Sequence, residues 1–79
     1  MQKVRQDISI GQNLRALRMS VKMTQEDVVA QLQLNGCDVS RSAYSQMESG
    51  TYNIRVSELI ALTQIFHVDF NTIFAGLER

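Results

Sequence analysis

Residues that break helices are scarce in this sequence. It contains no proline, no tryptophan, one cysteine and four glycines among 79 residues. Proline and glycine are the strongest interruptions of regular structure, so their scarcity favours helices. Valine and isoleucine do not form alternating runs, so strands are poorly supported. A lone cysteine, Cys37, excludes an internal disulfide. We therefore expect an all-α fold.

Long hydrophobic runs and an excess of charge are also missing. No stretch is apolar enough to span a bilayer, and the first ten residues lack the apolar core of a signal peptide. We therefore expect a cytoplasmic protein without a membrane partner. Eight basic and eight acidic residues give a net charge of zero. This balance disfavours indiscriminate binding to nucleic acid but permits a site-specific binder.

Catalytic and metal-binding patterns are absent from the sequence. One cysteine and one histidine, Cys37 and His67, fall short of the four ligands of a zinc site. No serine or cysteine stands in a recognisable arrangement with a base and an orienting group. We predict no enzyme activity, no metal site and no cofactor.

Capping signals and apolar periodicity predict the first two of five helices. Ser9 and Gln12 form a capping-box pattern, which places the start of the first helix at Ser9. Ile10, Leu14, Leu17 and Val21 then recur on one helical face. The second helix starts at Thr24 with Asp27 at the third position, and Asn35-Gly36 is its stop signal.

Three further helices follow in the same way. The third starts at Ser40 and runs to about Ser49, with Gly50 as its terminator. The fourth covers about 56–66, and the fifth starts at Asp69, an N-cap candidate. The length predicts a single domain over 1–79, with 69–79 as the terminal helix. Residues 1–8, which carry Lys3 and Arg5, are a tail, an extension of the first helix or an arm on DNA.

The third helix has two chemically different faces. Ala43, Tyr44 and Met47 share an apolar face that we assign to the core. The opposite face carries Arg41 together with Ser42, Ser45, Gln46 and Ser49. Arginine and glutamine can pair with base edges in bidentate fashion, and serine permits a close approach to a groove. The segment from Thr24 to Gly50 therefore predicts a helix pair that reads base pairs.

Several motifs in the right order carry a family resemblance. They are T-Q-E at 24–26, S-R-S at 40–42, Glu48-x-Gly50, and Leu59-x-x-Leu62-Thr63-x-x-Phe66-x-Val68. Over about Ile10 to Ala75, the chain resembles the Cro/C1-type (XRE-like) helix-turn-helix family of phage repressors and related bacterial regulators. The resemblance implies a compact bundle of five helices, with a helix-turn-helix formed by the second and third, as in lambda-repressor-like domains.

The resemblance also implies roles for individual residues. Positions that match the family's base contacts are Arg41, Ser42, Ser45 and Gln46. Positions that match or border its phosphate contacts are Thr24, Gln25, Ser40, Thr51, Tyr52 and Asn53. Arg18 and Glu48 match an ion pair that ties the first helix to the third. The terminal helix often forms the family's dimer contact, which here falls on Phe70, Ile73, Phe74 and Leu77.

The sequence departs from the family pattern at four places. Gln33 to Asp38 add residues between the second and third helices, as a lengthened second helix or a lengthened loop, which questions the usual angle between the two helices. Arg55 stands where Ser or Thr commonly caps the fourth helix, although arginine cannot accept backbone N–H bonds. His67 replaces a glycine that often ends that helix, and Tyr44 replaces an aliphatic residue.

Two functions fit these residues. The first is a homodimeric transcriptional regulator, acting as a repressor by occupying a palindromic operator in double-stranded DNA. The second is a protein-interaction module, such as an antitoxin or anti-regulator, that uses the same fold to hold a protein partner. The polar face of the third helix favours the first function, because protein-binding faces are usually anchored by aromatic or aliphatic residues.

Overall fold

A computed structural model describes residues 10–76 of the chain. Its described part contains five helices: α1 (Gly11–Ser20), α2 (Gln25–Leu34), α3 (Arg41–Ser49), α4 (Val56–Phe66) and α5 (Phe70–Ile73). No strand occurs within this part, and the all-α fold of five helices predicted from the sequence is confirmed. None of the described helices is long and apolar enough to cross a membrane.

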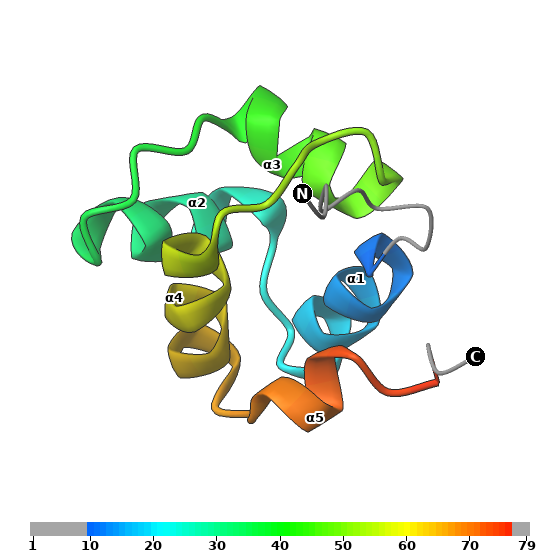
Figure 1. The fold of residues 1–79 in the computed structure, drawn as a ribbon. Helices are drawn as coiled ribbons and strands as arrows, with labels where there is room; N and C mark the ends of the chain where they lie inside the picture. The colour runs from blue at the N-terminus through cyan, green and yellow to red at the C-terminus, as the bar shows by residue number, and fades with distance from the viewer. Residues whose placement is uncertain (1–9, 77–79) are drawn as a thin grey trace.

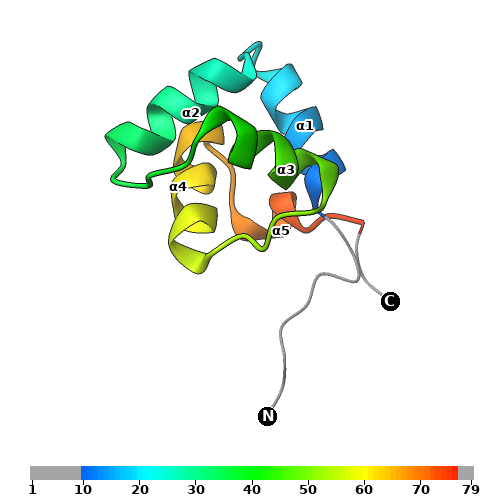
Figure 2. The ribbon, with the colours of Figure 1, turned by 90° about the horizontal axis from the view of Figure 1, so that it is seen from above.

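The helices surround one core (Figures 1 and 2). α3 packs against both α1 and α2, and α2 packs against α4. α5 closes the bundle beside α1, where the Nδ2 of Asn13 donates to the backbone oxygens of Ile73 and Ala75 at 2.8 and 2.9 Å. The buried apolar residues come from every helix, from the residue before α1 and from the connection before α3: Ile10, Leu14, Val28, Leu32, Val39, Tyr44, Met47, Ala61, Leu62, Phe66 and Ile73.

The predicted caps of α2, α3 and α5 are present. Thr24 and Asp27 form a reciprocal capping box. The backbone N–H of Asp27 donates to the Thr24 hydroxyl oxygen at 3.0 Å, and the backbone N–H of Thr24 donates to the Asp27 carboxylate at 2.8 Å. The Ser40 hydroxyl accepts the N–H of Ala43 at 3.0 Å, and a carboxylate oxygen of Asp69 accepts that of Thr72 at 2.9 Å. These caps satisfy N–H groups that the first turn of a helix leaves unpaired. The starts of α2, α3 and α5 were therefore correctly predicted.

Both ends of α1 differ from the prediction. Ile10 rather than Ser9 occupies the N-cap position, and it makes no side-chain cap. Ser9 itself and the tail with Lys3 and Arg5 lie outside the described residues. At the other end, Val21 follows the helix as its C-cap and is exposed. The apolar face of α1 therefore stops short of Val21.

The boundaries of α4 match the prediction, but its start is capped in another way. The Arg55 side chain makes no cap, as expected for a group without an acceptor. Instead, the carboxylate of Glu58 accepts the backbone N–H of Arg55 at 2.9 Å. His67 ends α4 in the left-handed conformation, with φ of 58° and ψ of 44°. The structure thus accommodates both departures from the family pattern.

Candidate nucleic-acid interface

The outer face of α3 is polar and open to solvent. All four residues predicted to contact bases lie on it and are exposed: Arg41, Ser42, Ser45 and Gln46. The opposite face anchors the helix, because Tyr44 and Met47 are at most 1% exposed. Gly50 ends the helix with φ of 88°, a conformation that glycine adopts without steric cost. The sequence therefore correctly predicted which side of α3 is available to a partner.

The lengthened connection between α2 and α3 is held at both ends. Gly36, which follows the C-cap residue Asn35, takes φ of 83°, and the N–H of Cys37 donates to the carbonyl of Leu32 at 2.9 Å. Val39 then inserts into the core with 1% exposure, immediately before Ser40 caps α3. Of the extra residues, Gln33 and Leu34 belong to the end of α2, and 35–38 form the loop that leads to α3.

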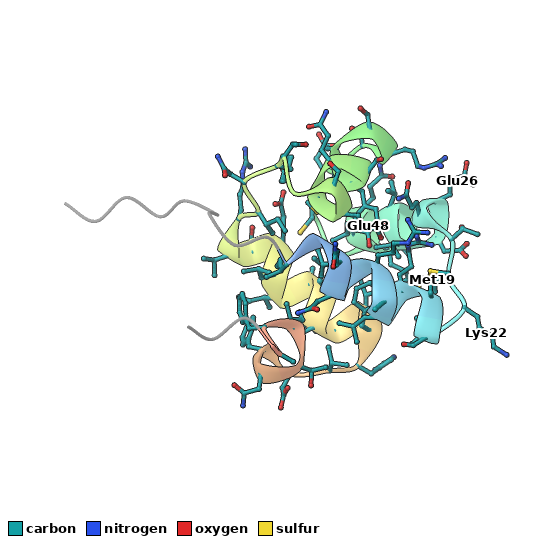
Figure 3. All side chains as sticks on the ribbon, turned by 90° about the vertical axis from the view of Figure 1, so that its right-hand side faces the viewer. Met19, Lys22, Glu26 and Glu48 are labelled. Atoms are coloured by element: carbon teal, nitrogen blue, oxygen red, sulfur yellow. The ribbon has the colours of Figure 1, made fainter. Side chains whose placement is uncertain are left out.

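Arg18 and Glu48 form the ion pair expected between α1 and α3. The Arg18 Nε lies 2.7 Å from Oε2 of Glu48, and Nη2 donates to Oε1 at 3.2 Å. Arg18 also donates from Nη1 to the carbonyl of Met23 at 3.0 Å. The side chains are 13% and 5% exposed. Figure 3 shows Glu48 between the ribbons of α1 and α3. The pair therefore fixes α3 against the body of the domain.

Opposing effects act on the ionisable groups around this pair. Burial raises the pKa of the Glu48 carboxyl, but hydrogen bonds from Arg18 and Gln25 outweigh burial and leave that pKa below its ordinary value. Burial and the neighbouring Glu48 raise the pKa of the Tyr44 hydroxyl. This hydroxyl lies beside the ion pair, without a hydrogen bond of good geometry among the described residues. The site therefore holds Glu48 ionised and Tyr44 neutral.

Gln25 links the ion pair to the outer face of α3. Its Nε2 donates to Oε1 of Glu48 at 3.0 Å, and its Oε1 accepts from the Nε of Arg41 at 3.1 Å. The Nη1 of Arg41 also lies 3.1 Å from Oε2 of Glu26. A continuous polar chain thus runs from the interior to the first residue of α3. The side chain of Gln25, predicted to meet a phosphate, is engaged within the protein.

The residues after α3 form a second polar edge. Thr51 shares a hydrogen bond of 3.1 Å with the hydroxyl of Ser49, and Asn53 is exposed. The Tyr52 hydroxyl donates to Oε2 of Glu58 at 3.0 Å. Glu58 is only 4% exposed, so its two hydrogen bonds satisfy an otherwise buried carboxylate. The loop predicted to follow a DNA backbone is thereby tied to the first turn of α4.

Two of the predicted phosphate contacts use their side-chain oxygens inside the protein. The hydroxyl oxygens of Thr24 and Ser40 accept backbone N–H groups as helix caps. Each hydroxyl retains its own O–H as a donor for an outside acceptor. Both residues are exposed, so capping and an external contact are compatible.

The predicted dimer residues do not all lie on the surface. Ile73 is fully buried in the core, so its assignment to an exposed dimer contact was wrong. Its side chain belongs to the core cluster, where burial stabilises the monomer. Phe70 and Phe74 are 44% and 41% exposed. Leu77 lies outside the described residues.

The contacts of two carboxylates of the site were not predicted from the sequence. Glu26 pairs with Arg41, and Glu58 anchors Tyr52. Glu58 stands three residues after Arg55, a capping-box spacing that was a usable signal. For Glu26 there was no such signal, because its pairing depends on how α2 and α3 cross.

Comparison with known proteins agrees with this geometry. Residues 9–71 match the family of helix-turn-helix domains. The structure is also similar to the crystal structure of the restriction-modification controller protein C.AhdI from Aeromonas hydrophila. The two share 25% sequence identity with a TM-score of 0.71, over 82% of this chain and 91% of that one. None of the curated proteins compared with the chain matches it.

The fold and the exposed face of α3 define a helix-turn-helix domain, a DNA-binding rather than an enzymatic architecture. The chain belongs to the helix-turn-helix family, as a DNA-binding transcription regulator of the Cro/C1 type. The resemblance found in the sequence is thus confirmed.

Proposed function

We propose that this protein is a transcriptional repressor that occupies an operator by inserting α3 into the major groove. The observation that carries the proposal is the face of α3 on which Arg41, Ser42, Ser45 and Gln46 are all exposed. Arginine reads guanine and glutamine reads adenine through paired hydrogen bonds. Apolar residues behind this face anchor the helix, so it presents the polar side chains on a rigid support.

The phosphate contacts belong to the same proposal. Thr24, Gln25 and Ser40 stand at the starts of α2 and α3, where backbone N–H groups and the helix dipole favour anions. Thr51, Tyr52 and Asn53 extend along the loop after α3. Contacts of this kind position a protein on the duplex, whereas base contacts supply the sequence preference.

We also propose that the protein acts as a homodimer of single domains spanning residues 1–79. Phe70 and Phe74 are four residues apart, and both remain exposed. Exposed apolar side chains at this spacing favour a helix-mediated contact. A symmetric dimer would read two half-sites of a palindromic operator, about 34 Å apart. The likeness to a controller protein supports a regulatory role.

The test starts with selection of bound duplexes from a random-sequence library by the purified protein. The selected duplex and a scrambled duplex of equal composition are then titrated at two salt concentrations. A dimer that neutralises about 6–10 phosphates should lose about 10³–10⁵ in affinity between ~50 and ~200 mM salt. A palindromic consensus is expected. Binding that ignores both sequence and salt would reject the proposal and leave the protein-interaction alternative.

Arg41→Ala provides the residue-level check. It should reduce discrimination at one base pair by about 1–3 kcal/mol while the thermal transition is retained. Arg55→Ala removes an equally charged, exposed arginine outside the predicted base contacts and is the matched control. Equal loss of discrimination in both variants would remove Arg41 from the base-reading set.

A further inference from the structure

Arg41 is held by a carboxylate from the neighbouring helix. Its guanidinium Nη1 lies 3.1 Å from Oε2 of Glu26, in the first turn of α2. The two side chains are 58% and 76% exposed. Figure 3 shows Glu26 at the outer edge of the molecule, in contrast to Glu48 in the interior. The guanidinium is therefore paired in the free protein yet remains accessible to another anion.

We propose that Glu26 is a positioning residue that restrains Arg41 in the free protein and releases it to DNA. The inference rests on the proposed function, in which Arg41 reaches DNA. The N–H group that faces Glu26 cannot at the same time donate in good geometry to a guanine or phosphate oxygen. Where DNA takes this N–H group, binding exchanges one acceptor for another, while the other Nη N–H groups of the guanidinium stay available. Glu26 would then be left as an unpaired negative charge near the phosphates.

Both consequences lower the affinity for DNA. The pair must be broken before Arg41 changes partner, and the freed carboxylate is repelled by the duplex. The effect is modest, because exposed ion pairs are weak: removing Glu26 should strengthen binding about two- to fivefold. Gln25 can retain its hydrogen bond to the Nε of Arg41 during the exchange. Glu26 thus sets the affinity, while Gln25 preserves the orientation of the side chain.

The inner ion pair between Arg18 and Glu48 cannot exchange partners in this way. Arg18 and Glu48 are 13% and 5% exposed, so no outside anion can replace their contact. Their pairing supports the fold in free and bound states alike. The outer pair is the one whose partner can change on binding.

The experiment is a double-mutant cycle on the library-selected duplex. Glu26→Gln preserves side-chain size and removes the charge. Affinities are measured for wild type, Glu26→Gln, Arg41→Ala and the double variant, with thermal melting as a check of the fold. Asp38→Asn is the matched control, because it removes one exposed negative charge from the connection before α3 without touching Arg41.

We expect Glu26→Gln to tighten binding about two- to fivefold, and we expect a smaller gain when Arg41 is alanine, because only the repulsion between the carboxylate and the duplex then remains to be removed. A gain equal to that of Asp38→Asn would overturn the proposal. So would a gain of the same size in the Arg41→Ala background, since both results indicate general charge repulsion alone. A wild-type protein without sequence preference would instead contradict the proposed function itself, so the two failures are distinguishable.

Discussion

The Nε of Arg18 lies 2.7 Å from Oε2 of Glu48, and this contact joins the C-terminal half of α1 to the last turn of α3. The same carboxylate accepts from Gln25 at the start of α2. One largely buried anion thus meets side chains from both helices that support α3. The orientation of α3 depends on this group as well as on apolar packing.

Arg18→Ala should lower the free energy of unfolding by about 3–5 kcal/mol, because Glu48 would remain largely buried without its cation. Urea denaturation measures the change through the transition midpoint. Arg15→Ala, an exposed arginine on the same helix, should change stability by no more than about 0.5 kcal/mol. Equal effects of the two substitutions would show that the ion pair contributes no more to stability than an exposed arginine does.

Stability should decrease in acid. The folded-state pKa of Glu48 lies below its ordinary value of 4.5, so its contribution is present above that value and is lost as pH falls through the folded pKa. The capping carboxylates Asp27 and Asp69 act in the same direction, since hydrogen bonds from Thr24 and Thr72 lower their pKa values. Urea titrations between pH 7 and about pH 3 test this linkage. Glu48→Gln should be less stable at neutral pH and show a shallower acid dependence; an unchanged dependence would exclude Glu48 as a source.

Gly11→Ala should destabilise the fold, although alanine is the better helix former. A Cβ at Gly11 would overlap the backbone carbonyls of Glu48 and Met47, because α1 crosses α3 closely at this point. Forcing a methyl group into packed backbone typically costs about 1–3 kcal/mol. Thermal melting should show a lower midpoint, whereas Gln12→Ala at the exposed neighbouring position should have little effect. A raised midpoint for Gly11→Ala would mean that the two helices can separate at small cost.

The two sides of α5 should respond differently to truncation. Ile73→Ala removes a fully buried side chain and should cost about 2–5 kcal/mol of stability. Replacing both Phe70 and Phe74 with serine should preserve the monomer fold and weaken self-association, because these residues are substantially exposed. Sedimentation over a range of concentrations measures the association. A double variant that remains as strongly associated as wild type would place the dimer contact elsewhere.

Local signals in the sequence were sufficient for most of the helix boundaries. Thr24, Ser40 and Asp69 cap their helices through bonds to residues three positions away, so the information lies within one turn. The burial of Ile73 could not be predicted from such local signals. The family resemblance placed it in the dimer contact, but only the packing of α5 against the rest of the domain determines which apolar residues are covered.

In the candidate site, too, some features could be predicted from the sequence and others depend on how the helices pack. The exposed face of α3 followed from its own periodicity, and the Arg18–Glu48 pair from the family resemblance. The contact of Arg41 with Glu26 joins residues fifteen positions apart, and it depends on how two helices cross. No local pattern encodes such a contact.

The loop before α3 has a consequence for how this domain can vary. Because Val39 is seated in the core and Ser40 caps the helix, α3 is fixed from Val39 onward, whatever path the chain takes before it. Gly36 and Cys37 are bonded back to α2, so the exposed Asp38 is the point at which the chain between these fixed parts can change. An insertion at Asp38 should leave α3 in place, which makes this position suitable for carrying a graft or a label.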